Sequence, residues 1–128
     1  MESVLFLIGR ILFGGYFIMM AISHFSRVEP MAGYAQSKRV PMPKPAVLFT
    51  GLLLLVGGVG ILLGIYINLA VAALVLFFVP VTFIMHAFWK IQDGQAKMME
   101  QIQFMKNTAL LAAILMLLAI PQPWPMSL

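Results

Sequence analysis

Four apolar stretches, each long enough to cross a lipid bilayer, constrain this sequence more than any other feature. A spanning helix needs about 20 mostly apolar residues, and residues 4–22, 46–67, 69–88 and 104–120 meet that need. Backbone groups in lipid must find hydrogen bonds within the spanning segment, so each stretch is expected to be an α-helix. Spans joined in series alternate in direction. We therefore predict an all-α integral membrane protein, an antiparallel bundle of four transmembrane helices that forms a single membrane domain over residues 1–128.

Composition supports this class and excludes others. Hydrophobic residues make up 62% of the chain and charged residues only 9%, whereas soluble domains carry about 25% charged residues. The absence of cysteine excludes a dithiol relay, a thiolate nucleophile and an iron–sulfur centre within the chain. No basic patch is interleaved with exposed aromatic residues, so nucleic acid is not an expected partner. The start Met1-Glu2-Ser3 is not basic, which favours a retained first helix over a cleaved signal peptide.

Two long connections carry nearly all of the positive charge. Residues 23–45 and 89–106 hold seven of the eight Lys and Arg residues, namely Arg27, Lys38, Arg39, Lys44, Lys90, Lys97 and Lys106. The excess of basic residues in cytoplasmic loops places both connections in the cytoplasm and both termini outside. Trp89 and Trp124 then fall at opposite membrane interfaces.

Short interfacial helices are expected in both cytoplasmic loops. In the first loop Pro30 opens such a helix, with Met31, Tyr34 and Ala35 toward lipid. In the second loop an interfacial helix runs into the fourth span, and Glu100 is interpreted as a solvated loop charge.

Arg10 is the one basic residue inside a span, where an uncompensated charge costs about 3 kcal/mol or more. Three interpretations are open. Its side chain reaches the interface, or it is paired inside the bundle, or it holds an anionic or carbonyl-bearing ligand. The candidate partners are Glu2, Tyr66, helix-end carbonyls and the carboxylate of Leu128.

A polar cluster is expected where three helices meet the cytoplasmic interface. His24 and His86 end helices that run in the same direction, so they lie at similar depth, and Thr82 and Asn107 fall at that level. The cluster is either a set of interfacial side chains bonded to loops or a site for a quinone head group or similar ring, with histidine donating to a carbonyl oxygen. Ligation of haem b by both histidines is a weaker alternative. Two imidazoles without cysteine make no metal site.

Helix-breaking and small residues shape the second and third spans. Gly57, Gly60 and Gly64 share one helical face and predict a small-residue packing seam. Pro80 is expected to kink the third span.

Six segments together resemble the DoxX family of small bacterial membrane proteins: "GRILFGGYF", "ISHF", "MAGYAQSKRVPMPKPA", "GLLLLVGG", "PVTFIMHAFW" and "QFMKNTALL". The resemblance implies a four-helix protein of the bacterial cytoplasmic (inner) membrane, with relatives among small subunits of quinone-reducing thiosulfate oxidoreductases and oxidative-stress complexes. The chain departs from many members at Leu54, where they carry glutamate, and at Ala87, where they carry an acidic or polar residue. The first departure removes the obvious intramembrane counter-charge for Arg10.

These observations rank three functions. The first is an accessory subunit of a quinone-linked membrane redox or oxidative-stress complex, with His24, Thr82, His86, Asn107 and Arg10 as candidate ligand-binding residues. The second is a ligand-free assembly or scaffold protein that packs through the glycine seam, and the third is a small-molecule carrier. The expected partners are the bilayer and either a homo-oligomer or a membrane redox protein. No nucleophile–base pair with an orienting third group is present, so a stand-alone enzyme is not expected.

Overall fold

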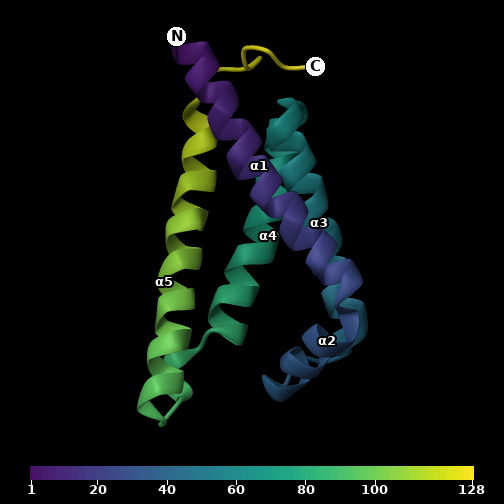
Figure 1. Cartoon of the computed structure of the whole chain (residues 1–128), viewed down its shortest axis with the longest axis vertical. Coiled ribbons are helices and arrows are strands. Elements are labelled where there is room, and N and C mark those ends of the chain that lie inside the picture. Colours follow the sequence, from purple (N-terminus) through teal and green to yellow (C-terminus); the bar gives the residue numbers. More distant parts are fainter.

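Four long helices form the body of the protein, as a computed structural model covering residues 1–128 shows (Figure 1). The chain runs through α1 (Glu2–Ser26), α2 (Val28–Ser37), α3 (Pro43–Leu63), α4 (Ile67–Met85), the 3-10 turn η1 (Phe88–Lys90), α5 (Gly94–Met116) and the 3-10 turn η2 (Leu117–Ala119). The helices α1, α3, α4 and α5 are long and apolar enough to cross a membrane. The prediction of an all-α membrane bundle of four spanning helices is confirmed.

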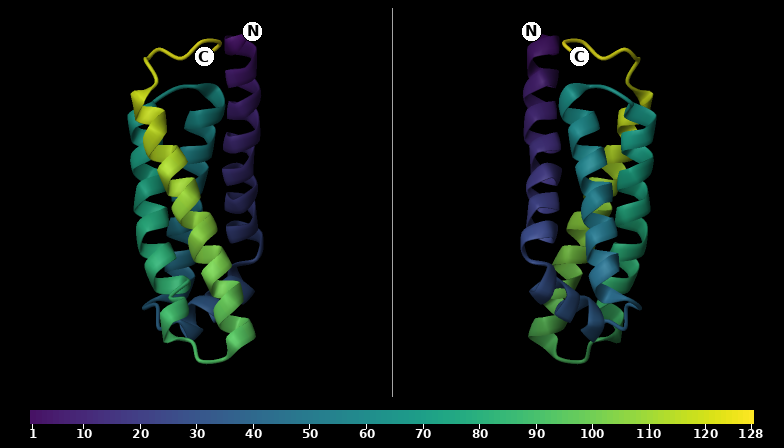
Figure 2. Two further views of the ribbon diagram at one scale, coloured as in Figure 1. Left: turned by 90° about the vertical axis from the view of Figure 1, so that its left-hand side faces the viewer. Right: turned by 90° about the vertical axis from the view of Figure 1, so that its right-hand side faces the viewer.

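Both chain termini lie at one end of the bundle, here called the terminal end (Figures 1 and 2). The opposite end, called the loop end, carries α2 and the connection between α4 and α5. The chain turns from α3 to α4 at the terminal end through Gly64 and Tyr66, both in the left-handed region with φ of 73° and 48°. A glycine suits the first of these positions because it lacks the Cβ that makes this region costly.

Two helices extend beyond the apolar stretches that predicted them. α1 continues to Ser26, and α5 begins at Gly94 instead of residue 104. Asp93 caps α5, because its carboxylate accepts a hydrogen bond from the backbone N–H of Ala96 at 2.9 Å. No proline lies within Gly94–Met116, so the expected interfacial helix and the fourth span form one continuous helix.

Packing between the helices is uneven. α1 packs mainly against α3, α3 also packs against α4, and α5 packs mainly against α4, while α1 and α5 make little direct contact. Figure 1 shows α5 diverging from the corner between α1 and α2 toward the loop end. The bundle is therefore less tightly closed at the loop end than at the terminal end.

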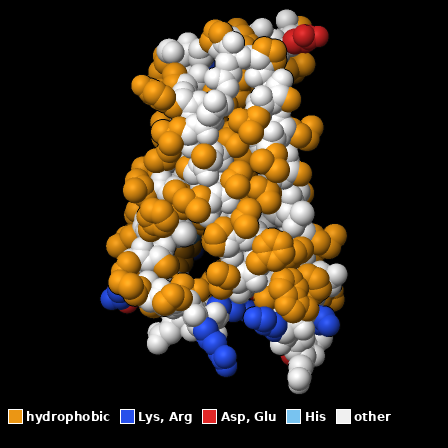
Figure 3. Space-filling model, turned by 180° about the vertical axis from the view of Figure 1, so that it is seen from behind, with side chains coloured by type: hydrophobic (Ala, Val, Ile, Leu, Met, Phe, Trp, Pro, Cys, Tyr) orange, Lys and Arg blue, Asp and Glu red, His pale blue; other side chains and the backbone are white.

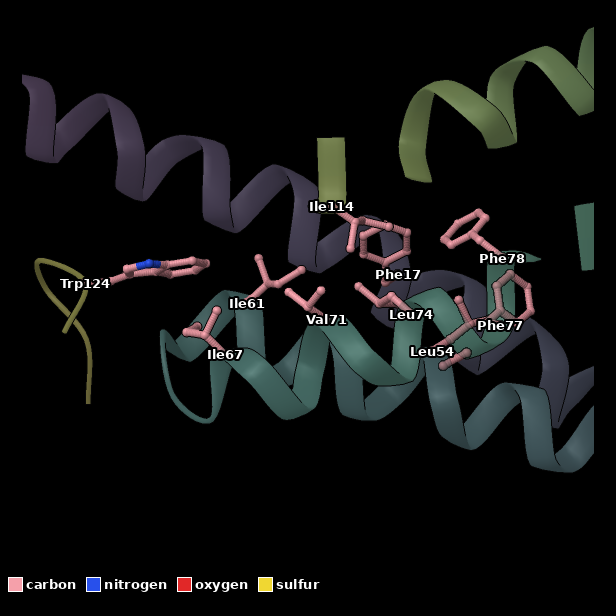
Figure 4. Close-up of a cluster of buried hydrophobic side chains, with 11 residues drawn as sticks. Phe17, Leu54, Ile61, Ile67, Val71, Leu74, Phe77, Phe78, Ile114 and Trp124 are labelled. Atoms are coloured by element: carbon pink, nitrogen blue, oxygen red, sulfur yellow. The ribbon is translucent and has the colours of Figure 1, made fainter. Parts of the chain in front are cut away.

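An apolar core joins α1, α3, α4 and α5 (Figure 4). Phe17, Leu54, Leu74, Phe78 and Ile114 are all fully buried in it. The rings of Phe17 and Phe78 meet edge to face at 5.8 Å, a favourable geometry for aromatic pairs. Many other large apolar side chains cover the outer surface, and Lys and Arg gather at the loop end (Figure 3). This surface requires a lipid bilayer as its solvent.

The glycine seam of α3 is used within the chain. A Cβ on Gly57 would lie 2.3 Å from Leu74, and one on Gly60 would lie 2.6 Å from Ala70. Both neighbours belong to α4. Gly57 and Gly60 therefore pack α3 against α4, and Gly64 lies after the helix beside Arg10 and Ser127. None of the three glycines is free to meet a partner helix, so the expectation that a scaffold function would use this seam is wrong.

Candidate functional site

A cavity of about 390 Å³ lies at the loop end, where side chains from α1 to α5 all contribute to its wall. Eleven of its 18 lining residues are hydrophobic, among them Phe77, Val81 and Met85 of α4. Figure 3 shows the surface hollowed in this half of the molecule. The volume and the apolar wall with few polar groups are typical of sites for small ligands.

Three members of the predicted polar cluster meet at this cavity. His24 from α1, His86 at the end of α4 and Asn107 from α5 all line it. Thr82 lies one turn before His86 but does not line the cavity, and its hydroxyl is buried without a hydrogen-bond partner. Arg10 does not line the cavity either. The structure thus brings together three of the five residues that the sequence singled out.

Each histidine ring is oriented by a hydrogen bond from Nδ1. The Nδ1 of His24 lies 2.9 Å from the backbone oxygen of Met20, one turn earlier in α1. The Nδ1 of His86 lies 3.2 Å from Oε2 of Glu100 in α5. Both rings are therefore held in place by contacts within the protein.

Glu100 is the centre of a polar network that links three helices beside the cavity. Its Oε1 accepts a hydrogen bond from the Tyr34 hydroxyl at 2.8 Å. Its Oε2 lies near His86 and 3.6 Å from the ammonium of Lys38. The carboxylate side chain is only 15% exposed, so its interpretation as a solvated loop charge is wrong.

The Tyr34 hydroxyl is bonded to this network, while 42% of the residue remains exposed at the surface. Partial burial, together with the hydrogen bond to the negative Glu100, raises the pKa of the Tyr34 phenol above its usual range. The hydroxyl is therefore protonated at neutral pH and donates to Glu100. Ala35, which was also expected to face lipid, is buried and lines the cavity.

One sequence signal could have identified Glu100. Glu100, Gln103 and Asn107 are spaced by three and four residues, which places them on one helical face. That face of α5 carries two of its polar side chains, Gln103 and Asn107, into the cavity wall. The partners of Glu100 in α2 and α4 could not be identified in this way.

Arg10 lies near the terminal end and is buried, with 3% of its surface exposed. Its guanidinium donates to the carbonyl oxygens of Ile61 and Leu62 at the end of α3, and of Pro125 and Met126 in the C-terminal segment. Helix-end carbonyls were among its predicted partners, and the last turn of α3 supplies two of them.

Trp124 packs beside Arg10 at the terminal end of the bundle (Figure 1). Its ring centroid lies 5.9 Å from Cζ of Arg10 and meets Phe6 edge to face at 5.0 Å. Only 2% of Trp124 is exposed. Trp89 in η1 and Trp124 in the C-terminal segment lie at opposite ends of the bundle (Figure 1), as predicted, but the ring of Trp124 is covered by the protein and does not face lipid.

Comparison with known proteins identifies the family. The DoxX family model matches residues 5–87, which span α1 to α4 and include both histidines. Nothing matches among the curated proteins or among the solved structures. Because the family model covers well over half of a chain that also has the expected four-helix membrane architecture, this multi-pass membrane protein belongs to the DoxX family.

Proposed function

We propose that the protein is an accessory subunit of a quinone-linked redox complex in the bacterial cytoplasmic membrane, and that the cavity at the loop end holds the ring of the quinone. The single observation that carries this proposal is the cavity, with two oriented histidines in an otherwise mostly apolar wall. Such a wall accepts a flat apolar ring, and the polar groups bind the oxygen atoms at its edge.

The position of the cavity supports a membrane-soluble ligand. It lies between helices that are apolar enough to cross a bilayer, at the end where the basic side chains gather. We further propose that this end faces the cytoplasm, because cytoplasmic loops carry the excess of Lys and Arg.

Native mass spectrometry tests the proposal. Protein extracted in mild detergent should carry a discrete added mass equal to that of a quinone or quinol. Val81→Trp, which places a large ring in the cavity wall, should remove the added mass. Val79→Trp is the matched control, because Val79 lies two residues away on α4, is 41% exposed and does not line the cavity.

Two results would contradict the proposal. One is a wild-type protein that carries no ligand in the mass spectrum and binds no added quinone. The other is equal ligand content in the two tryptophan variants, provided that both unfold at the temperature of the wild type.

A further inference from the structure

In both histidines at the cavity, Nδ1 is the nitrogen that faces an oxygen atom of the protein. Nδ1 of His24 faces the carbonyl oxygen of Met20, and Nδ1 of His86 faces a carboxylate oxygen of Glu100. A carbonyl or an ionised carboxylate offers only lone pairs, so the hydrogen must lie on Nδ1 in both rings. A neutral imidazole carries one N–H, and its Nε2 is then an acceptor. Neither Nε2 takes part in a hydrogen bond within the protein.

The other polar groups at the cavity do not discriminate between ligand forms. Lys106 supplies N–H donors, and the side-chain amides of Gln103 and Asn107 carry both a donor and an acceptor, so they can turn to suit either form. A donor binds a hydroxyl oxygen as well as it binds a carbonyl oxygen, since both have lone pairs. An acceptor such as Nε2 binds only a hydroxyl, because a carbonyl would set one lone pair against another. The two histidines are therefore the groups that determine whether the cavity binds a ring hydroxyl or a ring carbonyl more tightly.

From this arrangement of donor and acceptor atoms we propose that the cavity selects the reduced, dihydroxy form of its ring, a hydroquinone, over the oxidised dicarbonyl form. The Nε2 atoms of His24 and His86 accept the hydrogen bonds of the ring hydroxyls. The inference rests on the proposed function, that the cavity holds such a ring, and it reverses the hydrogen-bond direction expected from the sequence, in which histidine donates to a carbonyl.

Glu100 acts in this proposal as a positioning residue, because it fixes the tautomer of His86. In Glu100→Gln the side-chain amide can donate an N–H to Nδ1, and the imidazole hydrogen can then move to Nε2. The altered ring donates to a carbonyl, so the preference of the site shifts toward the oxidised form. His24 is held by the backbone oxygen of Met20, which no side-chain substitution removes, and it serves as an internal reference.

The test measures the affinity for both forms of one ring. Full-length protein in detergent is titrated without oxygen by calorimetry with a dimethoxy-methyl hydroquinone and with the corresponding benzoquinone, and empty micelles give the blank. Replacing one well-placed hydrogen bond by a contact between two lone pairs weakens the affinity for a ligand by about tenfold. We expect the wild type to bind the hydroquinone at least about tenfold more tightly, and Glu100→Gln to reduce that ratio. Glu29→Gln is the charge-matched control, since Glu29 is exposed and pairs with Lys44 away from the cavity.

Nitrogen NMR of isotope-labelled histidine adds a readout that packing alone would not change. The chain has two histidines, so both rings can be assigned with one substitution. We expect the hydrogen on Nδ1 in both rings of the wild type, and on Nε2 of His86 in Glu100→Gln.

The outcomes separate the inference from the proposed function. If neither form binds, the proposed function fails. Binding in the cavity is shown when both forms bind the wild type and Val79→Trp but neither binds Val81→Trp. If the benzoquinone then binds the wild type as tightly as the hydroquinone or more tightly, the preference for the reduced form is overturned while the proposed function stands. A hydrogen on Nε2 of either wild-type ring also overturns it. A hydroquinone preference unchanged in Glu100→Gln overturns the role of Glu100.

Discussion

Replacing Arg10 should loosen the terminal end of the bundle. The guanidinium donates to Ile61 O at 3.2 Å, Leu62 O at 3.0 Å, Pro125 O at 2.6 Å and Met126 O at 3.4 Å. In Arg10→Met the carbonyl of Ile61 loses the one fully buried bond of the four, which costs about 2 kcal/mol. The other three carbonyls are partly buried and recover some hydration, so together they add about 1 kcal/mol. We expect the free energy of unfolding to fall by about 3 kcal/mol, roughly a 150-fold shift in the equilibrium.

Tryptophan fluorescence during chemical unfolding in mixed micelles measures this change. Trp124 packs beside Arg10, so its emission should move to longer wavelength when the C-terminal segment is released. A Trp89→Phe background isolates that signal, since the chain has two tryptophans. Arg10→Lys keeps the charge but not the planar fork of donors, and should lose an intermediate amount. Leu12→Met, at a 70% exposed position, is the control. An Arg10→Met protein within 1 kcal/mol of the wild type, with unchanged emission, would refute the reasoning.

Three further predictions address other parts of the molecule. Gly14→Ala should lower the free energy of unfolding by about 2 kcal/mol, because its Cβ would lie 2.7 Å from a backbone oxygen of α3. The added Cβ of Gly15→Ala meets nothing within 4 Å, so that variant should raise the free energy of unfolding by about 0.5 kcal/mol. Equal effects of the two variants on thermal unfolding would contradict the close packing of α1 against α3 at Gly14. The Tyr34 phenol, whose pKa is raised, should ionise only above the usual value of about 10. The stability that the phenol contributes should be present below that value and lost as the pH rises through the raised pKa. The absorbance difference between wild type and Tyr34→Phe measures the ionisation of this phenol, and ionisation at the usual pH would contradict the prediction. Single cysteines at Glu2 and Gln95 should react with an impermeant thiol reagent from opposite sides of the membrane, Gln95 from the cytoplasm; labelling of Glu2→Cys from the cytoplasm would reverse the proposed orientation.

The fold was predictable because the constraint that decides it is local. Lipid demands a long apolar helix wherever the chain crosses, and four such stretches are visible in the sequence. The helix ends were less predictable, because polarity marks where the membrane ends and not where the helix ends. The segment from Gly94 to residue 103 carries charges yet runs into the fourth span without a break, since Asp93 caps α5 and the helix contains no proline.

The candidate site was predictable only in part, for a different physical reason. His24, His86 and Asn107 could be placed together because the direction and depth of three helices follow from the spans. The contact between Tyr34 and Glu100 joins residues 66 positions apart, and it depends on α2 folding beneath the bundle. Helix-end carbonyls were predicted as partners of Arg10, but the sequence could not say which ones, because every residue carries a backbone carbonyl.

Different contacts hold the two ends of the bundle together. Near the terminal end the Arg10 guanidinium ties α1, α3 and the C-terminal segment together, and Gly14 and Gly58 bring the backbones of α1 and α3 close. At the loop end α1 and α5 part, and the cavity takes the place of direct packing. There the polar network of Glu100 supplies the connection, through Tyr34 of α2 and His86 of α4. Under the proposed function, a ring bonded to Nε2 of His24 and of His86 would fill this cavity and would supply the contacts that α1 and α5 do not make directly.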